Sequence, residues 1–347
     1  MEFEEGKKDL SSKGLFPLLK EQPLLGTEHY KKRKPVRMTP EQFSEISKLN
    51  AEETAALREI LKDPKLVEWA HLIADQCFIP ETIGKDPELP EGDDLSKAWF
   101  AAAYFGADAA MEHYRRQGFP QEVLFDTMTD ITAWLRNTKR NYGVIGLARG
   151  RGWEVSLYHG NVIRRGRLEC NTTCIYDWDL ADQSGNILLK KGDPVINLHI
   201  PEDGPMDMNS CGKSMKLMSE FFASCKPDYD WKGFHCISWL LDPLLLPMLQ
   251  EGSNILKFSR LGYLYPVDIK SDTQFRVFGT TDPEKVENPT SLQRKAAEFL
   301  KSGGVFLEGG VYLPREMIEA VDYDLEKLIA ANRELCLKAD CSNFKIG

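Results

Sequence analysis

The sequence has no apolar run long enough to cross a bilayer. Its longest apolar stretch, residues 237–249, is shorter than the roughly 20 residues that a membrane helix needs, and it contains Asp242, Pro243 and Pro247. The first ten residues, MEFEEGKKDL, carry charges of both signs and lack the apolar segment of a secretion signal. We therefore expect a cytoplasmic protein with no membrane partner.

An excess of positive charge is also missing. The 44 Lys and Arg residues are outnumbered by 53 Asp and Glu residues, which gives a formal net charge of −9 at pH 7. Nucleic-acid binding rests largely on the neutralisation of phosphates, so this balance argues against a nucleic-acid partner. The fractions of hydrophobic (42%) and charged (28%) residues are those of an ordinary globular protein, which argues against a disordered, collagenous or coiled-coil chain.

Familiar phosphate, hydrolase and metal motifs are absent from the sequence. It contains no P-loop, no GxGxxG, no GxSxG and no HExxH motif. The 8 cysteines include two closely spaced pairs, Cys170 with Cys174 and Cys336 with Cys341, but neither has the doubled spacing of a zinc site. We expect reduced thiols and no metal.

What the sequence does contain first is a series of helical signals. Thr39 and Asn50 are each followed three residues later by Gln or Glu, which is the pattern of a capping box. Apolar residues then recur at helical spacing over residues 98–116 and 120–140, which predicts one helix in each range.

The length of 347 residues suggests two domains, and the first is helical. Strand-like runs are missing before residue 150. We predict a flexible lead-in over residues 1–38, which includes a basic run at 31–34, and an all-helical domain over residues 39–150.

Beyond residue 150 the pattern changes to that of a mixed sheet. Residues 153–159 fit either a last helix or a first strand, and periodicity alone does not decide between them. The strand 194–200 (PVINLHI), a helix over about 207–224 and the strand 234–241 form a crossover unit, which predicts two parallel neighbours. Further strands are predicted over residues 167–176, 187–189, 254–265, 273–279 and 305–312, and further helices over 290–300 and 314–338.

We therefore predict an α+β or α/β fold. An all-helical N-terminal domain precedes a mixed-sheet domain with a crossover helix over residues 151–313, and residues 314–347 form a C-terminal helix and tail. The apolar stripe of that last helix either packs on its own domain or forms a homodimer.

Side-chain alternation places polar groups on one face of each crossover strand. Asn197 and His199 point away from the oily face of the first strand, as Cys236 and Ser238 do on the second. Parallel strands between helices are usually apolar on both faces, so these residues indicate a cleft. In the alternative interpretation, Asn197 and His199 meet a loop or the N-terminal domain, and Cys236 and Ser238 are small core residues.

The loop after the first crossover strand gives a weaker signal for phosphate. A strand that leads through a glycine-containing loop into a helix aims backbone N–H groups at an anion. Here Gly204 is the loop's single glycine, and Glu202 and Asp203 oppose a negatively charged ligand.

Several short segments resemble a known group of proteins. The segments are His199-Ile200-Pro201, residues 236–243 (CISWLLDP), Ser253-Asn254-Ile255 with Phe258, Gly166-Arg167-Leu168, and the helix with Trp99 and Tyr104. They resemble bacterial acyltransferase-like proteins, in which a helical N-terminal domain precedes a domain similar to the GCN5-related N-acetyltransferase (GNAT) fold. The resemblance covers roughly residues 65–310.

The resemblance implies an acyl-CoA or acetyl-CoA co-substrate. In the GNAT fold, the strand before the crossover helix offers backbone groups to the pantetheine and thioester, and the following loop binds the pyrophosphate. The donor-binding residues implied in this chain are Asn197, His199, Ile200, Gly204 and Asn254.

The implied activity is acylation of a small amine, and an acidic protein attracts a cationic acceptor. His199 is the first candidate for the base and Glu202 the second, while Ser238 or Tyr263 serves the leaving thiolate. The alternative is a catalytically inactive GNAT-like domain that binds a small molecule or a partner.

Overall fold

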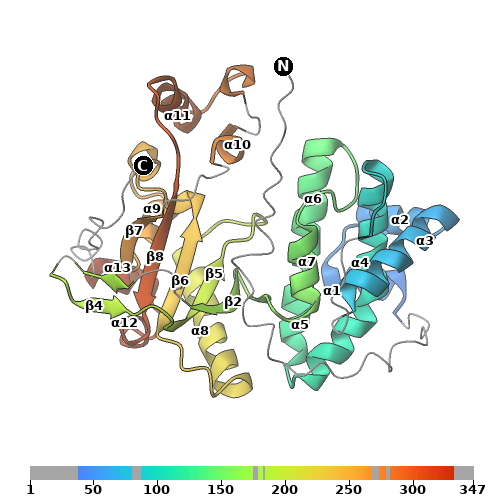
Figure 1. Ribbon diagram of the computed structural model, residues 1–347, viewed down its shortest axis with the longest axis horizontal. Helices are drawn as coiled ribbons and strands as arrows, with labels where there is room; N and C mark the ends of the chain where they lie inside the picture. The colour runs from blue at the N-terminus through green and yellow to red at the C-terminus, as the bar shows by residue number, and fades with distance from the viewer. Residues whose placement is uncertain are drawn as a thin grey trace. The chain divides into compact units, whose positions relative to one another are not determined.

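The computed structural model describes residues 38–79, 87–174, 179–182, 184–267, 273–278 and 282–331. The basic run at residues 31–34 and the pair Cys336 and Cys341 lie outside them. The chain divides into two compact units, the helical unit Met1–Arg164 and the sheet unit Arg165–Gly347 (Figure 1).

The described part of the helical unit contains α-helices and one π-helical turn. They are α1 (Pro40–Ser47), α2 (Ala51–Ile60), α3 (Pro64–Ile73), a π-helical turn (Ala74–Phe78), α4 (Asp93–Arg116), α5 (Gln121–Met128), α6 (Asp130–Tyr142) and α7 (Arg151–Tyr158). The predicted capping boxes are confirmed, because Thr39 caps α1 with Gln42 and Asn50 caps α2 with Glu53.

The single helix predicted over residues 120–140 is wrong, since α5 and α6 meet at Thr129. The Thr129 hydroxyl donates a 2.6 Å hydrogen bond to the Asp126 carbonyl, and the Thr129 N–H reaches the same carbonyl at 3.3 Å. A side chain that bonds to nearby backbone in this way competes with the regular helical pattern.

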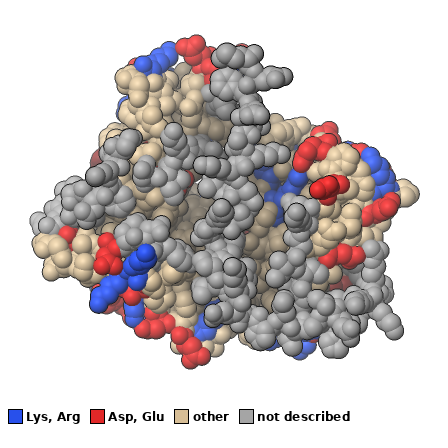
Figure 2. Space-filling model, viewed as in Figure 1, with Lys and Arg blue, Asp and Glu red and all other residues tan. Residues whose placement is uncertain are grey.

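The segment 153–159, which fits a helix or a strand, is helical as far as Tyr158, because it belongs to α7, and α7 packs on the central helix α4. The Tyr158 hydroxyl donates to the Ala103 carbonyl at 2.7 Å, and the Tyr114 hydroxyl donates to the Leu157 carbonyl at 2.7 Å. Both tyrosine rings are buried, so each phenol needs such a partner. On the face in Figure 2, acidic and basic side chains intermingle over the described helical unit.

The sheet unit holds a six-stranded mixed sheet in the order β1-β2-β5-β6-β8-β7, and β3 and β4 form a separate pair. The strands are β1 (Ile163–Arg165), β2 (Leu168–Cys174), β3 (Leu180–Ala181), β4 (Ile187–Leu189), β5 (Pro194–His199), β6 (Gly233–Ser238), β7 (Tyr263–Val267) and β8 (Glu308–Pro314). The helices are α8 (Met208–Cys225), α9 (Asn254–Ser259), α10 (Thr273–Phe278), α11 (Ser291–Lys301), α12 (Arg315–Glu319) and α13 (Leu325–Ala331).

The predicted crossover unit is confirmed. β5 and β6 are parallel neighbours, joined through α8, and their other neighbours β2 and β8 run antiparallel to them. The fold is therefore a helical region followed by a mixed-sheet domain, as the sequence predicts.

Two predicted strands are wrong. Residues 254–265 begin with the helix α9, because the Ser253 hydroxyl caps the Leu256 N–H, and only the last part continues into β7. Thr273–Phe278 alternates like a strand but forms α10, whose Phe278 packs with Ala296 in a small apolar core beside α11.

The long helix predicted over residues 314–338 is also wrong within the part of it that the structure describes. Pro314 ends β8, and α12 and α13 are separated by Asp322 and Tyr323, whose φ angles of 49° and 62° interrupt the helix. The buried side chains of Leu325 and Leu328 belong to α13, which packs on α8 of the same chain. The homodimer stays a prediction.

Among the described residues, no helix combines the length and the apolar character of a membrane span.

Candidate functional site

The parallel strands β5 and β6 part at their carboxyl ends. Among the described residues, their paired positions are Ile196 with Phe234 and Asn197 with His235, although the strands continue to His199 and Ser238. β5 keeps its antiparallel pairing with β2 as far as His199. The ends of β5 and β6 are therefore not paired with each other, which leaves a gap in the hydrogen-bond ladder between them. This gap lies at the carboxyl end of the parallel strands, where ligands of α/β proteins bind.

A row of polar side chains lies on one face of the sheet beside this gap. The register pairs Asn171 of β2 with Asn197 of β5, and Asn197 with His235 of β6. Because side chains two residues apart share a face, His199 lies on this face too. We call Asn171, Asn197, His199 and His235 the polar stripe.

The first three residues of the polar stripe form a hydrogen-bonded cluster. His199 Nε2 lies 2.6 Å from Asn171 Oδ1, and Asn197 Nδ2 donates to the same oxygen at 3.2 Å. Asn197 Nδ2 also lies 3.1 Å from His199 Nε2, so this ring nitrogen faces both an amide oxygen and an amide donor. Burial, together with a smaller contribution from the neighbouring His235, lowers the pKa of His199 to about 4, so the ring is neutral at pH 7.

His235 is a member of the polar stripe that the sequence reasoning missed. The residue is 4% exposed, and burial lowers its pKa to about 4. Nε2 shares a hydrogen bond with the Tyr265 hydroxyl of β7, while Nδ1 is buried with no hydrogen-bond partner in the described structure. Alternation along β6 could have shown that His235 opposes Cys236, but not that it lies beside Asn197, since that depends on the strand register.

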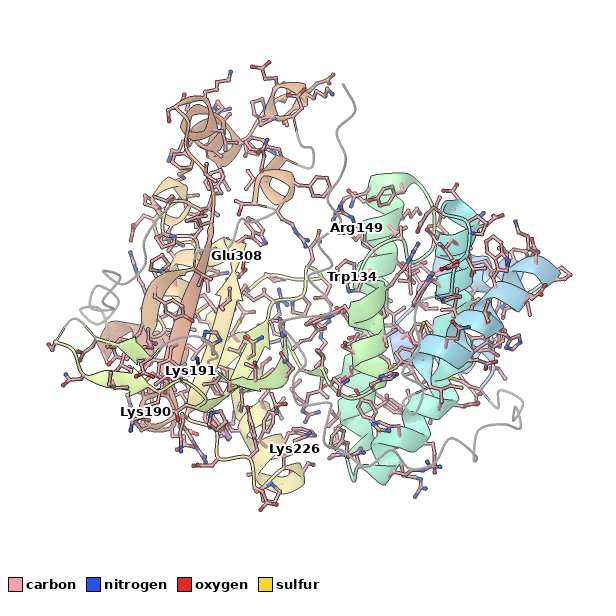
Figure 3. All side chains as sticks on the ribbon, in the orientation of Figure 1. Trp134, Arg149, Lys190, Lys191, Lys226 and Glu308 are labelled. Carbon is pink, nitrogen blue, oxygen red and sulfur yellow. The ribbon has the colours of Figure 1, made fainter. Side chains whose placement is uncertain are left out.

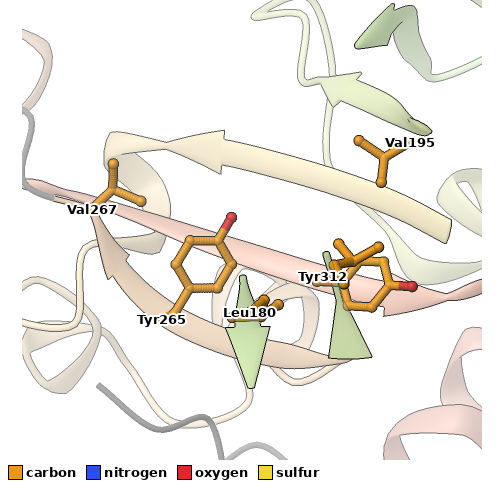
Figure 4. Close-up of a cluster of buried hydrophobic side chains, with 6 residues drawn as sticks. Leu180, Val195, Tyr265, Val267 and Tyr312 are labelled. Carbon is orange, nitrogen blue, oxygen red and sulfur yellow. The ribbon is translucent and has the colours of Figure 1, made fainter. Parts of the chain in front are cut away.

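Tyr265 links the polar stripe to an apolar cluster on the same face. Its ring packs with residues of four other strands, and Figure 4 shows its hydroxyl at the edge of this group: Leu180, Leu189, Val195, Val267 and Tyr312. A Cβ on Gly310, directly opposite in β8, would collide with the Tyr265 ring, so the glycine makes room for it. The hydroxyl is thereby held against His235.

Glu308 is a second residue that the sequence reasoning missed. It begins β8 and is labelled in Figure 3. The register of β7 with β8 and of β6 with β8 puts it on the same face as His235, at the end of the sheet where β5 and β6 part. In the sequence, Glu308 alternates with Gly310 and Tyr312, and this spacing could have shown that the three residues share one face of a strand.

The other candidate catalytic residues lie apart from His199. Ser238 is on the opposite face of β6, where its hydroxyl accepts a hydrogen bond from the Leu240 N–H. Tyr263 is on β7, three strands away from β5 in the sheet, and burial raises its pKa. Glu202 is exposed in the loop after β5.

The candidate donor-binding residues fall into two groups. Asn197, Ile200 and Gly204 lie along β5 and the loop that leads to α8, and Asp207 caps α8 by accepting from the Ser210 N–H at 2.9 Å. Asn254 begins α9, after β6. Cys236 is 1% exposed on the face opposite His235, in line with its interpretation as a small core residue.

No group of three or more metal-ligating side chains occurs in the part of the chain that the structure describes.

Two family models match the chain, one for each unit. Residues 38–160 match the N-acyltransferase N-terminal domain, and residues 162–312 match the GNAT-like C-terminal domain. The chain thus combines a helical N-acyltransferase N-terminal domain with a GNAT-like domain. This agrees with the parallel β5 and β6 and their crossover helix α8.

Solved structures share the fold of this GNAT-like protein. An acyltransferase in complex with decanoyl-CoA and teicoplanin is 22% identical, with a TM-score of 0.62, and the match covers 82% of this chain and 91% of that one. An acyltransferase mutant in complex with octanoyl-CoA is 21% identical, with a TM-score of 0.63 and the same coverage. The comparison with curated proteins gave no match.

Proposed function

We propose that the protein is an acyl-CoA-dependent N-acyltransferase that acylates a small amine. The observation that carries this proposal is the gap between β5 and β6 with the polar stripe beside it. The solved structures with the same fold hold octanoyl-CoA or decanoyl-CoA, which supports an acyl-CoA as the donor here.

The donor lies along the gap in this proposal. The β5 backbone beyond Asn197, at His199 and Ile200, lacks a β6 partner in the described ladder and is available to the pantetheine amides. Gly204 in the loop before α8 lies toward the pyrophosphate, where backbone N–H groups and the positive end of the α8 dipole favour an anion. Asn254, at the start of α9, contacts the donor in this proposal from the segment that follows β6.

The reaction exchanges a thioester for an amide. The amine nitrogen attacks the thioester carbonyl carbon, the C–N bond forms and the C–S bond breaks. The amine loses one proton, and the CoA sulfur leaves as a thiolate that gains one. A base and an acid positioned at these atoms accelerate the transfer.

His199 is the base in this proposal. A neutral imidazole ring has one nitrogen lone pair that can accept a proton, and the contacts of Nε2 with Asn171 and Asn197 hold the His199 ring in place. Glu202, exposed in the adjacent loop, is the second candidate. Ser238 and Tyr263 remain candidates for protonating the thiolate only if the bound donor places its sulfur near them.

The test compares wild type with His199→Ala in an assay of CoA-thiol release with an amine library, read also by the mass of the product. We expect His199→Ala to bind acyl-CoA as wild type does and to lose transfer by about 100-fold or more, the usual size of a general-base contribution. His113→Ala, in the helical unit, is the matched control.

Two results contradict parts of this proposal. Retained transfer in His199→Ala removes His199 from the mechanism. Donor binding by wild type without transfer to any amine favours the alternative, a GNAT-like domain that binds a ligand without turning it over.

A further inference from the structure

The loop between β5 and α8 is held by one arginine from the start of β2. The Arg167 guanidinium donates to three carbonyl oxygens of the loop, through Nη2 to Pro201 at 2.8 Å and to Gly204 at 2.7 Å, and through Nε to Pro205 at 2.8 Å. Its Nη1 also lies 3.7 Å from Asp203 Oδ1. A single side chain therefore contacts four of the eight residues, 200–207, that join β5 to α8.

The backbone of Arg167 is fixed as firmly as its side chain. The N–H groups of Arg167 and Leu168 both donate to the buried Ser214 hydroxyl of α8, at 2.7 and 3.2 Å. The preceding Gly166 has a φ of 67°, a conformation that favours glycine. The arginine side chain is only 9% exposed, so its position is determined by β2 and α8 together.

These contacts determine which way the loop's peptide groups face. In a trans peptide, the C=O of one residue and the N–H of the next point in opposite directions, and no described peptide bond is cis. Because the Pro201 and Pro205 carbonyls point toward Arg167, the N–H groups of Glu202 and Met206 point away from it. A loop without a glycine-rich sequence thus has two backbone donors on the side away from Arg167.

The same contacts change the electrostatics of the loop. From the sequence, Glu202 and Asp203 oppose an anionic ligand. The ion pair with Arg167 offsets the charge of Asp203, whose side chain is 17% exposed.

We propose that Arg167 is a positioning residue for the donor, one that shapes the β5–α8 loop to receive the pyrophosphate of acyl-CoA. This inference rests on the proposed function. Arg167 touches loop carbonyls and not the reacting atoms, so it governs donor affinity and leaves the chemical step unchanged.

The experiment measures the affinity of Arg167→Lys and Arg167→Gln for two donors. One donor is octanoyl-CoA, and the other is octanoyl-pantetheine, which has the thioester and amides but no pyrophosphate. Lysine keeps the charge but loses the planar fork that reaches three carbonyls. Arg315→Lys, at the opposite end of β6 and paired with Glu319, is the matched control.

We expect both Arg167 variants to bind octanoyl-CoA about 10-fold or more weakly, the factor expected from losing charge-assisted hydrogen bonds. We expect octanoyl-pantetheine affinity and kcat at saturating donor to stay within about 2-fold of wild type, because the pyrophosphate contacts alone are lost. Arg315→Lys is expected to match wild type with both donors.

Equal weakening of both donors, or no weakening of either, overturns the inference, since a general structural role moves both donors alike. Melting curves and circular dichroism identify a variant that fails to fold. The variant Asp203→Asn is a second test. It leaves the three hydrogen bonds from Arg167 to the loop carbonyls in place, so we expect it to retain octanoyl-CoA binding. Loss of that binding overturns the inference. Wild type that binds neither donor overturns the proposed function and this inference with it, whereas wild-type binding with unaffected Arg167 variants overturns this inference alone.

Discussion

At the scale of single residues, the site depends on imidazole rings kept neutral by burial. His199 and His235 lie on adjacent parallel strands, and burial lowers the pKa of each to about 4. A neutral imidazole can accept a proton at pH 7, while a protonated one cannot. The same burial makes the folded state sensitive to acid.

Each of these histidines is expected to destabilise the fold at low pH. The folded pKa of about 4 lies below the unfolded value of 6.5, so the unfolded state binds more protons between these two values. The free energy of unfolding is therefore unaffected by His235 above about pH 6.5 and falls as the pH drops from about 6.5 to about 4.

His235→Gln tests this pH dependence through urea unfolding at a series of pH values. We expect its slope of unfolding free energy against pH to be shallower than that of wild type by one proton, about 1.4 kcal/mol per pH unit. Burial also lowers the pKa of His159 in the helical unit to about 4, so His159→Gln is expected to reduce the slope by a similar amount. Slopes that match wild type in both variants contradict this account.

At the scale of elements, local signals predict helix starts better than they predict strands. Thr39 and Asn50 act within four residues of themselves, so a sequence pattern is enough to identify them. Thr273–Phe278 is different: its alternation is typical of a strand, but packing of Phe278 against α11 decides for a helix. Short apolar runs are ambiguous for this reason.

The close contact between β7 and β8 is expected to make Gly310 irreplaceable. A Cβ there would collide with the Tyr265 ring, so we expect Gly310→Ala to destabilise the sheet unit by about 1–3 kcal/mol, the usual cost of overpacking. The measurement is the urea unfolding midpoint.

The control for Gly310→Ala is the same change at Gly152 of α7, where a Cβ meets no atom within 4 Å. There the helix preference for alanine predicts a gain of about 0.5–1 kcal/mol. Equal effects of the two substitutions would contradict the packing explanation.

At the scale of the whole molecule, the sequence predicts the order of the elements but not their lateral arrangement. The helix-rich first part, the crossover unit and the polar residues on β5 are all visible as local patterns. The pairing of Asn197 with Asn171 and His235 is not, because register joins residues distant in the chain. His199 is therefore a candidate that the sequence alone predicts, while the positions of His235, Tyr265 and Glu308 on the same face required the structure.

The loop before α8 shows the same limit. Its sequence indicates a poor anion site, since Glu202 and Asp203 are acidic and Gly204 is alone. The long-range contact from Arg167 alters that interpretation, because it pairs with Asp203 and orders the loop carbonyls. The family resemblance includes the segment Gly166-Arg167-Leu168, but it does not show which groups the Arg167 side chain contacts.

Donor binding is the central claim, and thermal unfolding of the wild-type protein with acyl-CoA tests it most directly. A ligand that binds the folded state alone raises its stability, by about 2.7 kcal/mol at a concentration 100 times the Kd. We predict that octanoyl-CoA or decanoyl-CoA raises the melting temperature in a saturable way, and that acetyl-CoA does so if short donors are accepted. The absence of any shift at millimolar concentrations of all three would contradict the account.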